Sequence, residues 1–138
     1  MIYKTSAAKT PTILCDTDFL IALLVENESN HKLAKDILNN NIETNFIYSN
    51  LTEYELLTVL SRKFDQNVAV QIYTLFKETF ENRFDFDVAY EEEIINCYKN
   101  SKNKNQSFFD IACLITAEKL NYKIASFDKF YPKELLAT

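Results

Sequence analysis

The sequence predicts an α/β fold in which a short parallel sheet of four or five strands is flanked by helices. Short apolar runs typical of buried strands alternate along the chain with longer segments whose apolar residues recur at helical spacing. That alternation is typical of parallel strands joined by crossover helices. The length of 138 residues fits one domain, so we expect a single domain over residues 1–138, with a polar lead-in over residues 1–11.

The first half of the chain is expected to supply two strands and four helices. Each predicted strand is a short apolar run, and each predicted helix follows a residue type that caps helices. In the second helix we expect Leu33, Ala34, Ile37 and Leu38 on the inner face. The expected strands are Thr12–Cys15 and Phe46–Tyr48, and the expected helices are Asp18–Val25, Ser29 or Asn30 to Leu38, Ser49 or Asn50 to Phe64, and Val68–Phe80.

The second half is expected to complete the sheet. Alternating apolar residues over Phe84–Val88 predict a third strand, and Lys123–Ser126 predicts a fourth. Between them we expect one helix over Ala89–Asn100 and another from a cap at Ser107 to about Leu120. A short strand or turn around Pro132 ends the chain.

Composition excludes several classes of site. The chain has no glycine, which excludes Gly-rich phosphate loops, so turns must depend on Asn and Asp. The three cysteines form no CxxC pair and His31 is the only histidine, so a zinc site is not expected and the cysteines should be buried, reduced thiols. No apolar run approaches the ~18 residues of a membrane span, and we expect a soluble, cytoplasmic protein.

Four acidic residues are expected to meet at one edge of the sheet. Asp16 directly follows the first strand, and Asp128 follows the fourth after one intervening residue. Asp110 and Glu55 lie near the starts of helices that adjoin these strands. Ligands of open parallel sheets bind beyond the carboxyl ends of the strands. Four carboxylates suit Mg²⁺ or Mn²⁺, which can activate water and neutralise charge on a phosphate, so the pattern favours metal-dependent phosphodiester chemistry.

The net charge of −5 agrees with this chemistry. Nucleic-acid binders usually carry a basic surface, and an acidic protein repels phosphate until a divalent cation neutralises its carboxylates. Basic residues that could contact the phosphates of a nucleic acid are Lys102, Lys104 and Arg62, and a base could stack on Tyr48, Tyr54, Phe108 or Phe127.

Three segments together resemble the motifs of PIN domains. ILCDTDFLIALL resembles the first motif, a strand that ends in an acid and turns into a helix. YSNLTEYELLTVLSRK resembles the second, with a serine six residues before the acid. QSFFDIACLITAEKLNYKIASFDKFY resembles the third and fourth together, although Ile111 replaces a small residue. The four acids lie 39, 55 and 18 residues apart, in the order that the resemblance requires.

The resemblance implies a three-layer fold and an endoribonuclease that uses Mg²⁺ or Mn²⁺, with Asp16, Glu55, Asp110 and Asp128 as catalytic and metal-binding residues. In size the chain looks most like a VapC-type toxin of a toxin–antitoxin pair. Such toxins cleave RNA, are commonly homodimers and are silenced by a small antitoxin. Glu53 is the alternative to Glu55, but we expect Glu53 to be a solvated helix residue.

Simpler interpretations exist for three of the four acids, all except Glu55. Asp16 could only cap a helix, Asp110 could only complement a helix dipole, and Asp128 could be a turn residue. We expect Asp18 to form a turn, the alternative being a carboxylate that supports the metal ligands. CDTDFL also resembles the opening of haloacid dehalogenase-type phosphohydrolases, with Asp16 as the nucleophile. A third possibility is a PIN-like binding module without activity.

Overall fold

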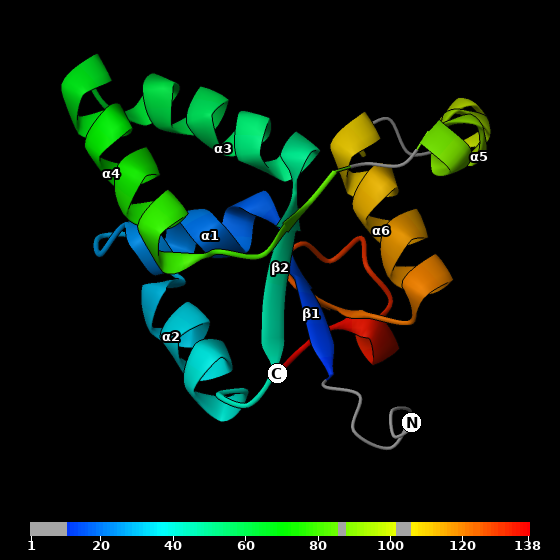
Figure 1. The fold of residues 1–138 in the computed structure, drawn as a ribbon, viewed down its shortest axis with the longest axis horizontal. Helices are drawn as coiled ribbons and strands as arrows, with labels where there is room; N and C mark the ends of the chain where they lie inside the picture. The colour runs from blue at the N-terminus through cyan, green and yellow to red at the C-terminus, as the bar shows by residue number, and fades with distance from the viewer. Residues whose placement is uncertain (1–10, 86–87, 102–105) are drawn as a thin grey trace, which may run out of the picture.

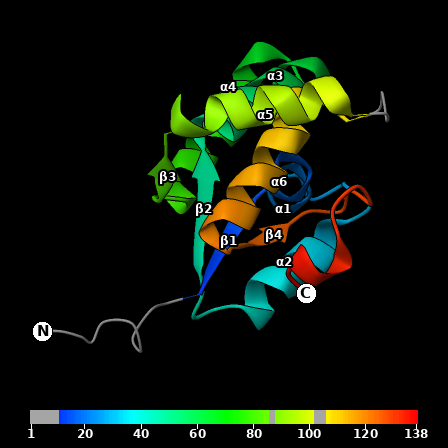
Figure 2. The same ribbon diagram turned by 90° about the vertical axis from the view of Figure 1, so that its right-hand side faces the viewer.

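A four-stranded parallel sheet lies at the centre of the residues that the structure describes, which are 11–85, 88–101 and 106–138. In this computed structural model the sheet has the strand order β3-β2-β1-β4 (Figures 1 and 2). All three pairings are parallel, so the carboxyl ends of the strands lie at the same edge. The strands are β1 (Thr12–Cys15), β2 (Asn45–Ser49), β3 (Arg83–Phe84) and β4 (Lys123–Ala125).

Helices cover both faces of the sheet, which gives the three layers that the sequence predicts (Figures 1 and 2). Alternate residues of β1 face opposite layers: Ile13 and Cys15 join one core cluster, and Leu14 joins another. The first cluster includes residues of α1 (Thr17–Leu24), α2 (His31–Asn40), α3 (Asn50–Lys63) and α4 (Gln66–Thr79). The second includes residues of α6 (Phe108–Leu120), against which α5 (Val88–Asn100) packs.

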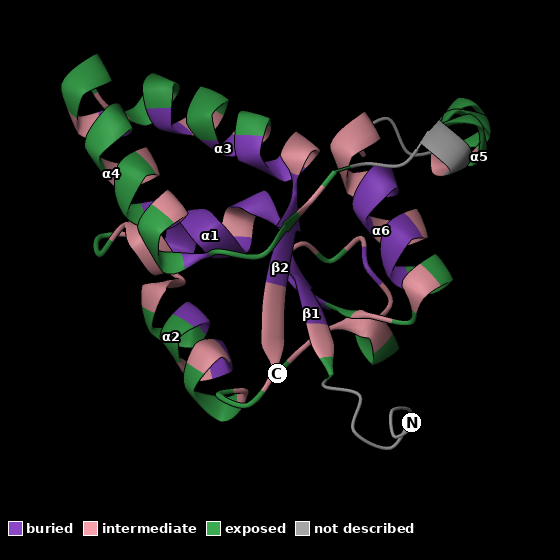
Figure 3. Ribbon diagram, viewed as in Figure 1, coloured by how far each residue is buried: buried purple, intermediate pink, exposed green. Residues whose placement is uncertain are grey.

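Buried residues line β1, the carboxyl half of β2 and the sides of α1 and α6 that pack on the sheet (Figure 3). The expected fold class and nearly all of the expected elements are confirmed. Ser49 and Ser107 cap α3 and α6 through their side chains, as predicted. Without glycine, the chain ends α6 with Asn121 in the left-handed region at φ 58°, a conformation that Asn tolerates.

Two local predictions are wrong. The third strand covers Arg83–Phe84 rather than Phe84–Val88, and Val88 already begins α5. The strand stops because Phe84 pairs with Ser49, which is the last residue of β2, so no residue of β2 remains to pair with Asp85. Leu33 is 53% exposed, because it lies at the edge of the apolar face of α2, about 100° around the helix from the buried Ala34.

The end of the chain returns to the sheet. A short 3₁₀ helix, η1 (Lys133–Leu135), follows Pro132, and Leu136 then bridges Ile124 in parallel. The Ala137 amide donates to the Ile124 carbonyl at 2.8 Å, so the last residues cover the outer edge of β4. Among the described helices, none combines the length and the apolar character that a bilayer span requires.

Candidate active site

Asp16 lies between β1 and α1 and is almost completely buried. Its Oδ1 accepts from the Thr17 amide at 2.9 Å, so Asp16 caps α1 as the simpler interpretation predicted. Its Oδ2 accepts from the Ser126 hydroxyl at 2.9 Å and from the Tyr131 hydroxyl at 3.2 Å. Burial, followed by the charge of Asp18, raises the pKa of Asp16 from 3.8 to about 7. A cap needs no burial of this kind, so capping alone does not explain the position of Asp16.

Asp18 is a helical residue, and the prediction that it forms a turn is wrong. It lies in the first turn of α1, where its Oδ2 accepts from the Phe127 amide at 3.1 Å. Its Oδ1 lies 3.1 Å from the Ser126 hydroxyl, whose single proton it shares with Asp16. It therefore ties α1 to the segment that leaves β4. Burial is the main cause that raises the pKa of Asp18 to about 6, and the charge of Asp128 adds to it.

Glu55 and Glu53 point to different places although both lie near the start of α3. Residues two apart on a helix are about 200° apart around the axis. Glu55 accepts a hydrogen bond from the Thr17 hydroxyl beside Asp16, and its pKa is raised by burial and by the charge of Asp110. This position supports the choice of Glu55 over Glu53. We call Glu55, Asp16, Asp18, Asp110 and Asp128 the acid cluster.

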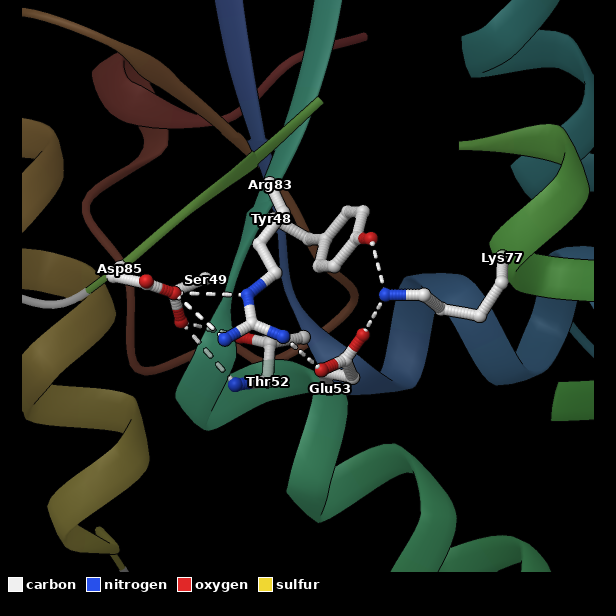
Figure 4. Close-up of polar contacts among 7 residues, drawn as sticks. All are labelled: Tyr48, Ser49, Thr52, Glu53, Lys77, Arg83 and Asp85. Carbon is white, nitrogen blue, oxygen red and sulfur yellow. Dashed lines mark hydrogen bonds and ion pairs between the residues drawn. The ribbon is translucent and has the colours of Figure 1, made fainter. Parts of the chain in front are cut away.

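Glu53 is buried among cationic partners, so the prediction that it is solvated is wrong. Its side chain is 2% exposed and lies between Lys77 of α4 and Arg83 of β3 (Figure 4). Arg83 Nη1 lies 2.6 Å from Glu53 Oε2, and Lys77 also donates to the Tyr48 hydroxyl at 3.2 Å. These two cations compensate the buried carboxylate, which explains how it can lie inside the protein.

Asp110 and Asp128 are held by local hydrogen bonds at the same edge of the sheet. Asp110 forms a capping box with Ser107: Asp110 Oδ2 accepts from the Ser107 amide at 3.0 Å, and Ser107 Oγ accepts from the Asp110 amide at 3.1 Å. Asp128 Oδ1 accepts from the Phe130 amide at 3.0 Å, and the Asp128 amide donates to Ser126 Oγ at 3.0 Å. Both simpler interpretations are thus true of the local geometry.

The structure brings these acids into mutual electrostatic range. Asp16 is affected by the charges of Asp18 and Asp110, Asp18 by Asp128, and Glu55 by Asp110. Within the described part of the chain, none of these five carboxylates forms an ion pair with Lys, Arg or His. A cluster of carboxylates that lacks a cation is costly to bury, and a bound divalent ion would relieve that cost.

The carboxylate oxygens of the acid cluster are the ligand type that a hard cation prefers, but these oxygens do not converge on one position. Over residues 11–85, 88–101 and 106–138, no three His, Cys, Asp or Glu side chains are placed to hold one ion together. Each carboxylate is engaged instead with a hydroxyl or amide donor of the protein, and like charges repel. Oxygen-only donors without a compensating cation nonetheless match what Mg²⁺ and Mn²⁺ prefer.

The raised pKa values give a test in the absence of metal. The folded pKa values of Asp16 (about 7) and Asp18 (about 6) lie above the ordinary 3.8. The two protonated carboxyl groups therefore stabilise the fold fully below about pH 4, and this stabilisation is lost as the pH rises through 6 to 7. With EDTA present, the melting temperature should therefore be several degrees lower at pH 8 than at pH 5.5. Mn²⁺ should reverse that loss at pH 8. An unchanged melting temperature across this range would contradict the raised pKa values.

The structure gives positions for some of the residues that were predicted to contact the substrate. Lys102 and Lys104 lie outside the described residues. Arg62 is exposed in the last turn of α3, at the opposite end of that helix from the acids. Tyr48 cannot stack on a base, because it is buried against Phe76 with ring centroids 4.6 Å apart.

The structure also gives positions for the remaining aromatic residues, the cysteines and His31. Tyr54 is exposed, whereas Phe108 and Phe127 contact other rings of the protein. The three cysteines are free thiols, two buried and one half-buried. His31 Nδ1 lies 2.7 Å from the Ala22 carbonyl oxygen, so His31 joins α1 to α2 as a packing residue.

Three hydroxyl-bearing residues of the site were not predicted from the sequence. Ser126 contacts both Asp16 and Asp18, Tyr131 contacts Asp16, and Thr17 contacts Glu55. The serine of the segment SFD was a usable signal for Ser126, because it stands two residues before an expected ligand. No comparable signal marks Tyr131.

Comparison with known proteins supports the same fold. Residues 13–133 match the family model of the PIN domain. The structure resembles VapC20 of Mycobacterium tuberculosis, a toxin that cleaves the sarcin-ricin loop, with 23% identity, a TM-score of 0.74, and coverage of 86% of this chain and 91% of that one. It also resembles VapBC2 of Rickettsia felis bound to a promoter DNA fragment (13% identity, TM-score 0.62, coverage 85% and 88%).

A third similar structure is PAE2754 of Pyrobaculum aerophilum, with 17% identity, a TM-score of 0.62, and coverage of 93% of this chain and 81% of that one. The comparison with curated proteins gives no significant match. At these identities the structural matches establish the fold, whereas the family match rests on the sequence itself.

Proposed function

The chain belongs to the PIN domain family, and from this premise we propose that it is a divalent-metal-dependent endoribonuclease that acts as the toxin of a toxin–antitoxin pair. One observation carries the proposal: five carboxylates lie at one edge of the sheet, and among the described residues no cation is paired with any of them. Such a site favours a metal ion and, through it, a phosphate.

The proposed ligands are Asp16, Glu55, Asp110 and Asp128, with Mg²⁺ or Mn²⁺ as the ion. When bound, the ion would lower the pKa of a water molecule and offset the charge that develops on the scissile phosphate. Asp18 is the proposed support of this set, because its contacts with Ser126 and Phe127 hold the start of α1 against the segment that carries Asp128.

The residues of the chain have different parts in this proposal. Asp16 is buried and already accepts three hydrogen bonds, so it serves as a fixed anchor rather than as a proton acceptor. Glu55 is half-buried, has a raised pKa and has one hydroxyl partner, Thr17. It is the acid best suited to accept a proton from an attacking water. Lys102 and Lys104 are the proposed phosphate contacts near the site. Arg62, at the other end of α3, would contact RNA only at a distance from the acids.

The proposal extends to partners and context. Because one similar structure is a complex of two components on promoter DNA, we propose a small antitoxin protein as the partner that silences the acid cluster. We further propose a homodimer of single-domain chains in the cytoplasm. The family assignment gives no support to the haloacid dehalogenase alternative, and the three donors on Asp16 make that carboxylate a poor nucleophile.

The test is cleavage of single-stranded RNA by the purified chain with Mn²⁺ or Mg²⁺, with and without EDTA. Cleavage that needs the ion, together with Mn²⁺ binding measured by calorimetry, is the expected result. A folded protein that binds Mn²⁺ but cleaves no RNA would overturn the ribonuclease activity. A folded protein that does neither would favour the inactive binding module instead.

A paired substitution tests the choice of Glu55 over Glu53. Glu55→Gln should lower kcat by on the order of 10²-fold with little change in melting temperature, because the residue faces the acid cluster and not the core. Glu53→Gln is the matched control on the same helix. It should lower the melting temperature by several degrees and leave kcat of the folded protein within about twofold. The reverse pattern would assign the site to Glu53.

A further inference from the structure

Tyr131 brings a buried hydroxyl to the acid cluster from the far end of the chain. It is 2% exposed and packs with Leu14, Cys113 and Ile124 in the second core cluster. Its hydroxyl oxygen lies 3.2 Å from Asp16 Oδ2 and 3.4 Å from the Asp110 carbonyl oxygen. The hydroxyl also interacts with the Cys113 thiol, so it links the second core cluster to the acids.

The hydroxyl completes the hydrogen bonding of one carboxylate oxygen. Each oxygen of an ionised carboxylate has about two lone-pair sites. Two hydroxyls face Asp16 Oδ2, Ser126 at 2.9 Å and Tyr131 at 3.2 Å, and because Ser126 shares its one proton between Asp16 and Asp18, Tyr131 is the second donor that this oxygen needs. Asp16 Oδ1 accepts only from the Thr17 amide at 2.9 Å among the described residues, which leaves one site open. The two oxygens of Asp16 are therefore not equivalent.

We propose that Tyr131 is a positioning residue that fixes the orientation of Asp16 so that Oδ1, with its open lone pair, is presented to a divalent cation. The inference rests on the proposed function, because it assigns the ligand atom within the same site. Three donors from three segments hold this carboxylate: the amide of α1, the hydroxyl after β4 and the hydroxyl of Tyr131. Partners that orient metal ligands in this way typically change metal affinity by 10- to 100-fold.

The chain offers a matched control in Tyr48. Tyr48 is 1% exposed, and its hydroxyl accepts from Lys77 at 3.2 Å in the ionic cluster around Glu53 (Figure 4). Tyr48→Phe and Tyr131→Phe therefore delete the same atom from equally buried rings. Only Tyr131→Phe removes a contact with the acid cluster.

The experiment is a titration of the full chain with Mn²⁺ alone, followed by calorimetry and by electron paramagnetic resonance of the free ion. Tyr131→Phe is expected to weaken Mn²⁺ affinity by about tenfold and to lower kcat at fixed Mn²⁺, with KM for RNA unchanged. Tyr48→Phe is expected to leave all three quantities unchanged. Melting temperatures in EDTA are measured for both variants, because a loss of packing would lower kcat and stability without selectivity for Mn²⁺.

The second test is a double-mutant cycle with Ser126→Ala. Both hydroxyls contact the same oxygen, so the loss of affinity in the double variant should be smaller than the product of the two single losses. Equal Mn²⁺ affinity and kcat in wild type and Tyr131→Phe would overturn the role of Tyr131 while the proposed function stands. A wild-type chain that binds no Mn²⁺ would overturn both.

Discussion

Asp16→Asn is expected to abolish metal-dependent RNA cleavage, with a loss of at least about 10³-fold, and to stabilise the metal-free protein. Asp16 is the most buried of the five acids and is affected by the charges of Asp18 and Asp110. An amide in its place removes the negative charge that would anchor the ion. It also removes the repulsion within the cluster, so activity and stability should change in opposite directions.

The fold can accommodate this substitution without leaving a donor unpaired. The amide oxygen can accept from the Thr17 amide, as Asp16 Oδ1 does. The amide nitrogen then faces the Ser126 and Tyr131 hydroxyls, which can accept as readily as they donate. The α1 cap is retained, because Asn caps helices about as well as Asp.

The sign of the stability change follows from the pKa of Asp16. The folded pKa of about 7 lies above the ordinary 3.8, so the wild-type protein loses up to about 4 kcal/mol as pH rises through this range. Asp16→Asn removes that loss. Thermal melts in EDTA should show a higher melting temperature for the variant at pH 8 and no difference near pH 4. A variant that melts lower than wild type at pH 8 would contradict the burial of an uncompensated charge.

The second large effect is expected in the ionic cluster on the other side of α3. The double variant Lys77→Met, Arg83→Met leaves the Glu53 carboxylate 2% exposed and without its cationic partners. Breaking a buried ion pair from one side is strongly destabilising, because the remaining charge is left in the interior. We expect a loss of about 3 kcal/mol in the free energy of unfolding, or about 10 °C in melting temperature.

Restoring neutrality is the control for this prediction. Adding Glu53→Leu to the double variant should recover most of the lost stability, since an apolar replacement of a buried ion cluster is often neutral or better. Urea unfolding of the wild type, the double variant and the triple variant gives the three free energies. Equal stability of the double and triple variants would contradict the assignment of Glu53 as the buried partner.

The sequence contained enough information for the sheet and for the acids at its edge. Alternation of apolar runs and amphipathic segments predicts the strand and helix order, and acids within a few residues after a strand lie near the carboxyl edge of a parallel sheet. Asp16 and Asp128 could be placed for this reason alone. The third strand could not be delimited, because its length depends on where β2 ends and not on its own residues.

The side-chain partners could not be predicted in the same way. Glu53 and Glu55 occupy similar local sequence, and what separates them is Lys77 and Arg83, 24 and 30 residues further along the chain. Ser126 and Tyr131 reach Asp16 from 110 and 115 residues away. Hydroxyls have no periodicity that marks such long-range contacts, so only the folded arrangement identifies them.

Two junctions between strand and helix leave no room for a change in chain length. Ser49 is both the last residue of β2 and the cap of α3, and Asp16 alone separates β1 from α1. An insertion or deletion of one residue at the start of α3 would rotate every later side chain by about 100°. Glu53 would leave its cations and Glu55 would leave the acid cluster at once. Relatives of this protein should therefore vary in length at their loops and never at these two crossings from strand to helix.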